Sequence, residues 1–236
     1  MIYIPTRATG KYLSFPDANQ YDVTGSFSLC FWCNTTAAAG GTFPIAIGKG
    51  VGLNNTSSYF TFMYQGQNAL SFGYQTTSNA QYLLTSTLPI TIGWKNAICV
   101  RDATANTMTI YINAVVAGSR STPAGANPAI TTTPVTIGGG SLDSVNRCWQ
   151  GNLMDCRIYS RALSTSEVSA IYAAKCVDNI FDDTLILRAC IADDCVGAGD
   201  MAGKKVYDHS AYRNHGTCTG AISAVADQYP PFRVAA

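Results

Sequence analysis

Short segments in which apolar and polar residues alternate recur along the chain, and this alternation predicts β-strands. In Thr107–Asn113, Met108, Ile110 and Ile112 occupy every second position and so share one face of an extended strand. Turn residues separate such segments from one another, which predicts an all-β, two-sheet antiparallel sandwich. The other segments of this kind are Ser26–Cys33, Tyr59–Tyr64, Leu70–Gln75, Trp94–Arg101, Val135–Gly138 and Asp183–Ile191.

The period of the apolar residues changes once, between residues 153 and 174. Leu153–Tyr159 alternates as a half-buried strand does, whereas Ala162–Ala173 has apolar residues at helical spacing. Between them, Ser164 and Glu167 stand at the spacing of a capping box, in which each residue's side chain accepts a hydrogen bond from the other's backbone N–H. The pattern predicts a strand followed by a single short helix near residues 164–175, with structural roles for Ser164 and Glu167.

The same stretch resembles the strand and short helix that end laminin-G-like domains. The usual form is roughly G-x-I-D-D-V-R-I-Y-x-R-A-L-S-x-x-E-I-x-x-L-Y, and Met154 departs from it where the family often has an acid. Upstream, Phe27–Trp32 and Trp94–Asp102 resemble two further strands of the family, so Trp32, Trp94 and Trp149 are expected to be structural. The resemblance implies a concanavalin A-like jelly roll. The matching residues are Gly151, Leu153, Asp155, Arg157, Ile158, Tyr159, Arg161, Ala162, Leu163, Ser164, Glu167, Val168 and Tyr172.

The last sixty residues contain a segment that is similar to one in the same family but stands elsewhere in the chain. Val206–Thr217 (VYDHSAYRNHGT) is similar to V-Y-D-x-S-G-x-x-N-H-G-T, which precedes the sandwich in many members. Here it follows the helix, as in a circular permutation. We expect residues 1–175 to form the laminin-G-like sandwich and residues 176–236 to pack back beside Tyr12–Phe15 and complete it. His215 is expected to lie in a turn and bond to backbone.

The amino-acid composition excludes some classes of binding partner. Charged residues make up 12% of the 236 residues, against about 25% in an average soluble protein. The net charge is +1 with no block of either sign, so neither a nucleic-acid nor a membrane partner is expected.

The N-terminus lacks the pattern of a secretory signal, which favours a protein made and kept in a reducing compartment. There the nine cysteines, including Cys30 and Cys33, would be small buried apolar residues, whereas Cys190 and Cys195 would be the first disulfide expected outside a cell.

Catalytic chemistry is not expected. Glycoside hydrolysis needs two carboxyl groups that flank the scissile bond, and Glu167 is the only glutamate of the chain. His209 and His215 do not fall at a familiar zinc spacing. Calcium is the metal that the resemblance implies, with Asp143 and Asp155 as possible loop ligands; solvated loop carboxylates are the alternative.

Two sets of residues are candidates for binding a partner. Tyrosines near Gly/Gln-rich turns are able to stack on sugar rings, although the same alternation is produced by core packing. A loop at residues 123–134 contains three prolines that limit its flexibility, which favours docking against a protein surface. The candidate glycan residues are Tyr59, Tyr64, Tyr74 and Tyr82, and those of the partner loop are Pro123, Pro128 and Pro134.

These observations lead to two functional hypotheses. The first is a non-enzymatic virion structural protein, a bacteriophage capsid decoration or head-surface protein, made in the host cytoplasm and bound to the virion surface as a trimer or dimer. A single weakly charged domain without a secretory signal favours it. The alternative is a carbohydrate-binding, lectin-like module or receptor-binding tail protein that acts outside the cell and holds glycans with the loops of the sandwich.

Overall fold

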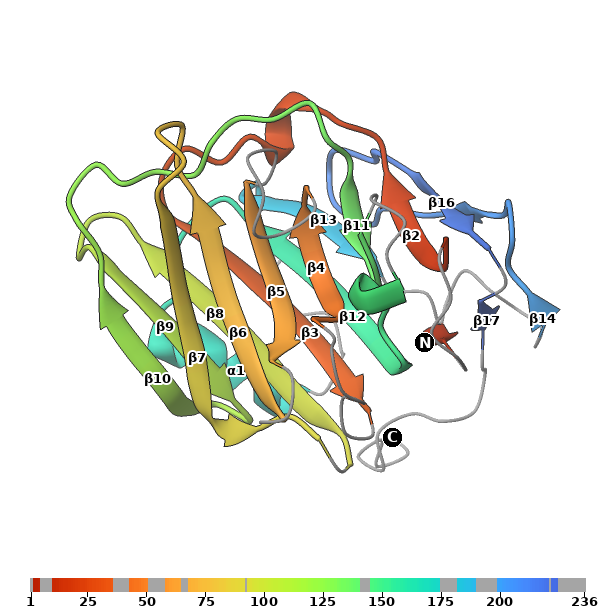
Figure 1. Cartoon of the computed structure of the whole chain (residues 1–236), viewed down its shortest axis with the longest axis horizontal. Coiled ribbons are helices and arrows are strands. Elements are labelled where there is room, and N and C mark those ends of the chain that lie inside the picture. The colour runs from red at the N-terminus through yellow and green to blue at the C-terminus, as the bar shows by residue number, and fades with distance from the viewer. Residues whose placement is uncertain are drawn as a thin grey trace.

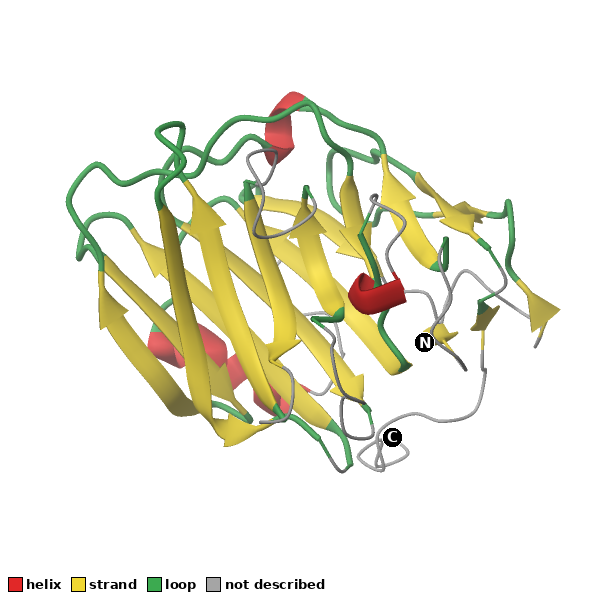
Figure 2. Ribbon diagram, in the orientation of Figure 1, coloured by secondary structure: helices red, strands yellow, loops and turns green. Residues whose placement is uncertain are grey.

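Two antiparallel β-sheets lie face to face, and one short α-helix packs on the outside of the first sheet (Figures 1 and 2). The all-β sandwich with a single short helix that the sequence predicts is therefore confirmed. The computed structural model describes residues 2–4, 10–35, 43–50, 58–64, 68–91, 93–140, 145–174, 182–189, 199–220 and 222–224.

The first sheet has the strand order β10-β9-β8-β3-β12-β1-β17-β14 within the described residues. One edge of β12 pairs with β3 along its length, and the other edge is shared end to end by β1 and β13. The chain's first described strand therefore lies in the middle of this sheet. The bounds are β1 Ile2–Ile4, β3 Phe27–Asn34, β8 Lys95–Asp102, β9 Thr107–Ile112, β10 Val115–Ser121, β12 Gly151–Tyr159, β13 Leu185–Ala189, β14 Gly199–Asp200 and β17 Ser223–Ala224.

The second sheet has the order β15-β16-β2-β11-β4-β5-β6-β7 within the same residues. Its two outer strands are β15, from the C-terminal part of the chain, and β7, from the first half of the chain. Of its strands, β4 and β7 are not among those that the sequence predicts. The bounds are β2 Tyr12–Phe15, β4 Ile45–Lys49, β5 Tyr59–Tyr64, β6 Ala69–Gln75, β7 Gln81–Pro89, β11 Val135–Ile137, β15 Lys205–Val206 and β16 Gly216–Thr219.

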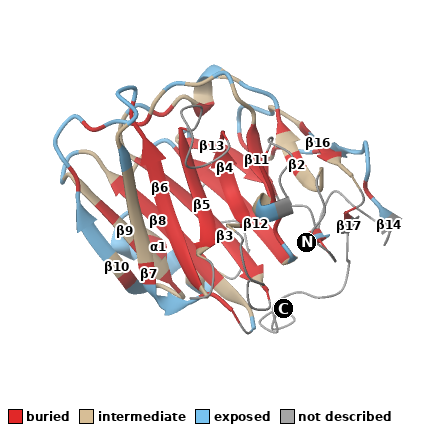
Figure 3. Cartoon of the chain, in the orientation of Figure 1, coloured by how far each residue is buried: buried red, intermediate tan, exposed pale blue. Residues whose placement is uncertain are grey.

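The core fills the space between the two sheets (Figure 3). Strand β9 shows the predicted alternation, because Met108, Ile110 and Ile112 are buried while the residues between them are half-buried. Across the core, the ring of Phe27 on the first sheet lies 5.2 Å from that of Tyr59 on the second, measured between centroids. Alternation along the strands thus produces the layered packing from which the sandwich gains most of its stability.

Strand β3 is buried on both faces, because helix α1 (Thr165–Ala174) covers the side that faces away from the core. Cys33 packs in the main core, whereas Cys30 packs with Val168 and Ile171 of the helix. The ring of Trp32 stacks on that of Tyr172, with centroids 5.9 Å apart. In the described ranges, no helix has the length and apolar character needed to cross a membrane.

Helix α1 begins with the predicted capping box. The backbone N–H of Ser164 donates to Glu167 Oε2 over 2.8 Å, and the backbone N–H of Glu167 donates to Ser164 Oγ over 3.3 Å. Arg161 adds a bidentate pair that the sequence analysis does not anticipate, with Nη1 to Oε2 at 2.9 Å and Nη2 to Oε1 at 2.7 Å. These hydrogen bonds from Arg161 lower the pKa of Glu167 to about 2.

Substituting Glu167 by alanine should lower the free energy of unfolding by about 1–2 kcal/mol, because it removes half of the capping box and a surface ion pair. Since the folded-state pKa lies below the unfolded value, this contribution is present above about pH 4.3 and fades as the pH falls toward 2. Urea denaturation at pH 7 and pH 3 measures both effects. Glu167→Gln keeps the hydrogen-bond acceptor and should cost less; equal loss in both variants would contradict a capping role.

The C-terminal segment supplies strands to both sheets. β13 pairs with β12 of the first sheet, and β16 pairs beside β2, with Cys218 opposite Leu13, as the sequence predicts for this edge. Gly216 of the NHGT segment is required there, since a Cβ would lie 2.5 Å from the backbone oxygen of Ser14. The division of the chain at residue 175 stays a prediction, but its two parts share hydrogen-bonded sheets.

Candidate ligand-binding site

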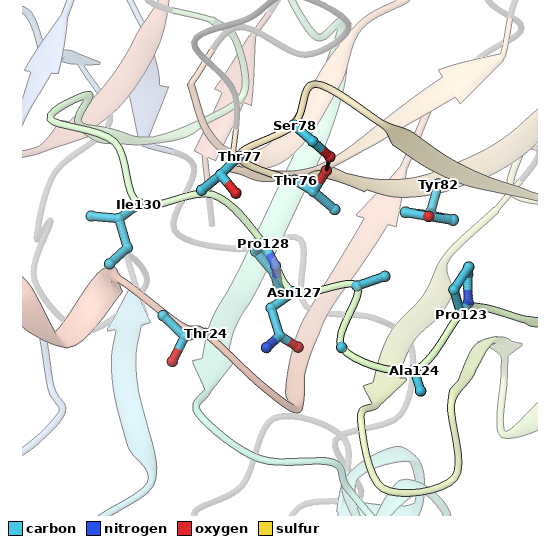
Figure 4. Close-up of a pocket in the computed structure, with 12 residues that line it drawn as sticks. Thr24, Thr76, Thr77, Ser78, Tyr82, Pro123, Ala124, Asn127, Pro128 and Ile130 are labelled. Atoms are coloured by element: carbon cyan, nitrogen blue, oxygen red, sulfur yellow. Dashed lines mark hydrogen bonds between the residues drawn. The ribbon is translucent and has the colours of Figure 1, made fainter.

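A cleft of about 520 Å³ opens at the end of the sandwich where the β6–β7 hairpin meets the loop after β10 (Figure 4). Hydroxyl groups and one amide supply its polar lining: Thr24, Thr76, Thr77, Ser78 and Asn127. Its other side chains are apolar or aromatic: Tyr82, Pro123, Ala124, Ala126, Pro128 and Ile130. Among the described residues, no carboxylate, imidazole, ammonium or guanidinium group lines the cleft.

The hairpin wall of the cleft is fixed by a network of hydroxyl groups. Thr76 Oγ1 accepts the backbone N–H of Ala80 over 3.2 Å and lies 2.9 Å from Ser78 Oγ. Asn79 has a φ of 63°, a left-handed conformation that asparagine tolerates better than most residues. The two hydroxyl groups are thus held at the rim of the cleft.

The loop wall is tied to both sheets by backbone hydrogen bonds. The N–H of Ala129 donates to the carbonyl of Gln75 on the second sheet over 2.7 Å, and that of Thr122 donates to the carbonyl of Asn106 on the first over 2.8 Å. A further donor comes from inside the sandwich, since Arg101 Nη2 lies 3.4 Å from the carbonyl oxygen of Ala126. The cleft therefore lies between two anchored segments.

Tyr82 is the aromatic residue of the cleft. It stands opposite Tyr74 in the β6–β7 pair, and the two rings lie 5.2 Å apart with 30° between their planes. Tyr74 is fully buried, whereas Tyr82, on an edge strand, is half-buried and reaches the cleft. Arg120 of β10 spans the gap between the sheets, with Nη1 2.6 Å from the carbonyl oxygen of Leu83 and its guanidinium carbon 5.9 Å from the Tyr82 ring centroid.

Comparison with known proteins identifies the family. The profile of the concanavalin A-like lectin/glucanases superfamily matches residues 7–169. The chain belongs to this superfamily. A comparison with curated protein sequences finds no match.

Solved structures confirm the fold of this concanavalin A-like domain. A Bacteroides ovatus protein to which carbohydrate binding has been attributed aligns over 95% of this chain and 61% of its own, with 15% identity and a TM-score of 0.63. The heptameric SAP-like pentraxin of Limulus polyphemus aligns over 72% of this chain and 80% of its own, with 16% identity and a TM-score of 0.54. The ligand-binding domain of botulinum neurotoxin serotype D, solved with N-acetylneuraminic acid, aligns over 75% and 43%, with 15% identity and a TM-score of 0.55. At these identities the likeness concerns the fold alone.

The cleft unites residues from both candidate sets of the sequence analysis. Tyr82 from the glycan set and Pro123 and Pro128 from the partner loop all line it. Pro134, the last proline of that loop, is half-buried next to β11 and does not line the cleft. The sequence analysis did not identify the hairpin at residues 76–78, whose hydroxyl groups complete the site.

Two of the four candidate glycan tyrosines were assigned wrongly. Tyr59 and Tyr74 are fully buried in the core, where both rings lie near Phe27, so neither contacts a ligand. Tyr64 is half-buried on the outer face of the second sheet and packs against Phe43, with centroids 5.8 Å apart. The alternative that the sequence analysis left open, core packing, holds for Tyr59 and Tyr74.

Asp155 is not placed to bind calcium, which corrects the expectation for this residue. It is buried in β12, at a bulge where its φ of 48° is left-handed. Arg157 donates to both of its oxygens, with Nε to Oδ1 at 2.9 Å and Nη2 to Oδ2 at 2.5 Å, and Arg188 Nε lies 3.1 Å from Oδ1. Two guanidinium groups thus occupy the carboxylate that a metal would need. Asp143 lies outside the described residues.

The tryptophans and the histidine that the sequence analysis expects to be structural belong to the framework of the fold. Trp32 and Trp149 are buried in full, and Trp94 is half-buried just before β8. His215 Nδ1 accepts the backbone N–H of Asp208 over 3.1 Å, the turn role expected for it. Cys190 and Cys195 lie outside the described residues. Within the described part of the chain, no group of three or more His, Cys, Asp or Glu side chains is arranged to hold a metal ion.

Proposed function

We propose that this domain is a carbohydrate-binding module that holds a glycan in the cleft beside Tyr82. The observation that carries the proposal is a half-buried tyrosine that lines a cleft together with hydroxyl and amide groups. Sugars present apolar C–H faces and a rim of hydroxyl groups, so a ring to stack on and short polar side chains to bond to are complementary to them. The cleft volume falls in the range of about 300–1,000 Å³ that is usual for small-ligand sites.

Binding, and not hydrolysis, is the activity proposed. The lining offers donors and acceptors in Thr76, Ser78 and Asn127, but among the described residues it offers none of the paired carboxyl groups that glycoside hydrolysis needs. Two structures of the same fold support this choice: the Bacteroides ovatus protein to which carbohydrate binding has been attributed, and the botulinum neurotoxin domain solved with N-acetylneuraminic acid. The proposal adopts the lectin-like hypothesis and its location outside the cell. Attachment to a phage capsid stays a prediction without support from the comparisons.

A single open cleft of this kind should bind one glycan weakly. The homo-oligomer expected from the sequence, a trimer or dimer, would repeat the cleft and raise the overall affinity through a high effective concentration at the second site. We include such an assembly in the proposal because it would let a weak, shallow site act on a surface that carries many glycan copies.

Replacing Tyr82 by alanine should lower glycan affinity about five- to tenfold, because a ring–sugar stacking contact of the order of 1–1.5 kcal/mol is lost. A glycan array identifies the ligands, and calorimetric or NMR titration of the best one measures the loss. Tyr82→Phe keeps the ring and should retain most of the affinity.

The matched control is Tyr212→Ala, which removes a tyrosine that is 49% exposed and does not line the cleft. It should leave binding unchanged. Melting temperatures separate a lost contact from a lost fold, since Tyr82 also packs against Tyr74. Absence of binding to every glycan on the array, or full affinity in a folded Tyr82→Ala protein, would refute the proposed function.

A further inference from the structure

We infer that the glycan held in this cleft is acidic, with an anionic group on the sugar that lies next to Tyr82 and Arg120. The inference rests on the proposed function and names the ligand class of the same site. It is carried by two arginines without ion-pair partners that stand on either side of the Tyr74–Tyr82 pair.

Arg120 is the first of these arginines and lies at the edge of the site. It is exposed, next to Tyr82 and three residues before Pro123, both of which line the cleft. One of its nitrogens, Nη1, donates to the carbonyl of Leu83, and no described carboxylate pairs with the guanidinium group. The remaining donors form a planar fork of the kind that binds carboxylate and sulfate groups.

Arg101 is the second and lies behind the loop wall. Its side chain is fully buried, with the guanidinium carbon 5.6 Å from the Tyr74 ring centroid. Its terminal nitrogens donate to backbone carbonyls, one of them that of Ala126 in the cleft wall, and Nε has no partner. A buried positive charge that is solvated only by carbonyl dipoles lacks a counter-charge, and an anion in the adjacent cleft would supply one.

The carboxylates nearest to the site in the chain are already engaged. Asp22, two residues before Thr24 of the lining, has Oδ1 3.1 Å from the buried Lys49 Nζ. Asp102, next to Arg101, accepts the backbone N–H groups of residues 104 and 105 over 2.9 Å each, in the turn after β8. Within the described residues, therefore, the two arginines beside the cleft have no carboxylate partner, although no charged side chain lines the cleft itself.

Arg120 also links the two sheets, because its hydrogen bond to Leu83 joins β10 to β7. A purely structural role would make the residue matter for stability and leave ligand preference unchanged. The test therefore measures preference between matched ligands, which a structural role does not alter.

The experiment uses oligosaccharides that end in a uronic acid, the same oligosaccharides with the carboxyl group reduced to an alcohol, and their sulfated forms. The wild-type chain should bind an acidic member about tenfold more tightly than its neutral partner, which is the factor expected from one charge-assisted hydrogen bond. This preference should decline as salt is raised. In Arg120→Gln the affinity for the acidic member should fall to that for its neutral partner, so that the preference is lost, whereas Arg120→Lys should retain part of the preference because the charge remains without the fork.

The control variant Lys204→Gln removes one exposed positive charge beside β15, at the opposite edge of the second sheet from β7, and should leave the preference intact. Equal affinity for acidic and neutral members, or an unchanged preference in a folded Arg120→Gln protein, would overturn the inference and leave the proposed function standing. Failure of every member to bind, with other glycans on the array still bound, would also overturn the inference alone, whereas undiminished binding in a folded Tyr82→Ala protein would overturn the proposed function as well.

Discussion

A chain truncated after residue 175 should not fold to a soluble monomer. The deleted part contains β13, which pairs with β12 in the middle of the first sheet, and β16, which pairs with β2 in the second. Its loss would leave backbone donors and acceptors of both sheets without partners, and unpaired strand edges promote association between chains. We expect aggregates, or a compact state without fixed tertiary packing.

The deleted part also contributes to the core. Leu187, Ala189, Val206, Cys218 and Ile222 are all buried in the main hydrophobic cluster, so truncation would open cavities as well as sheet edges. Each large buried apolar side chain lost from a core costs about 2–5 kcal/mol, and the sum exceeds the 5–15 kcal/mol by which a domain is usually stable.

Size-exclusion chromatography and near-UV circular dichroism of the truncated chain measure the outcome. A second truncation after residue 224 serves as the control, because it keeps every strand that the structure describes, and it should remain folded. A monomeric fragment of residues 1–175 with unchanged melting temperature would show instead that the C-terminal segment is a separate arm.

Asp155→Asn should lower the free energy of unfolding by about 3–5 kcal/mol, the usual cost of removing one member of a buried ion cluster. Arg157 is 1% exposed and Arg188 7%, so both guanidinium groups would stay buried without their shared carboxylate. Asparagine also tolerates the left-handed backbone at this position, so the change removes the charge without adding strain.

The pH dependence of the wild type should follow from the same cluster. Burial alone would raise the pKa of the Asp155 carboxyl, but Arg157 and then Arg188 outweigh it, and the pKa lies below its ordinary value. A carboxyl group with a depressed folded-state pKa stabilises the protein above its unfolded pKa of about 3.9, and this stability is lost as the pH falls through the folded value. The wild type should therefore lose stability in acid more steeply than Asp155→Asn.

Urea denaturation at pH 7 and at pH 3 tests both parts of this prediction. Asp183→Asn, which removes an exposed carboxylate, is the matched control and should change stability by less than about 0.5 kcal/mol. A loss of similar size at both positions would contradict the role assigned to the buried cluster.

Much of the sandwich follows from alternation and local signals in the sequence. The strand at β9 and the capping box at Ser164 and Glu167 lie where local pattern places them, because both depend on neighbours within a few residues. Strands β4 and β7 are not predicted by local alternation. In β4 every residue is buried, and in β7 the edge position leaves most residues half-buried or exposed, so neither strand shows two clearly different faces.

The site is less predictable, because it depends on which face of which strand meets the partner sheet. Tyr74 and Tyr82 stand opposite each other on neighbouring strands, yet only Tyr82 lies on an edge strand and reaches the cleft. The family resemblance implies a possible loop ligand at Asp155, but Arg188, 33 residues away, lies on β13 and shares its carboxylate. The order of the strands in the sheets determines both the access of Tyr82 to the cleft and the pairing of Asp155 with Arg188. The local sequence pattern does not predict this order.

The position of β1 has a consequence for the order in which the domain can form during synthesis. Ile2 pairs with Leu153 on one side and with Ala224 on the other, so β1 cannot complete its pairing until the segment around Ala224 has been made. Contacts so distant along the chain close slowly, and until they close the edge of a nascent sheet is open to other chains. We therefore expect the domain to reach its native state only after residue 224 has left the ribosome and to depend on chaperones that shield this edge in the meantime.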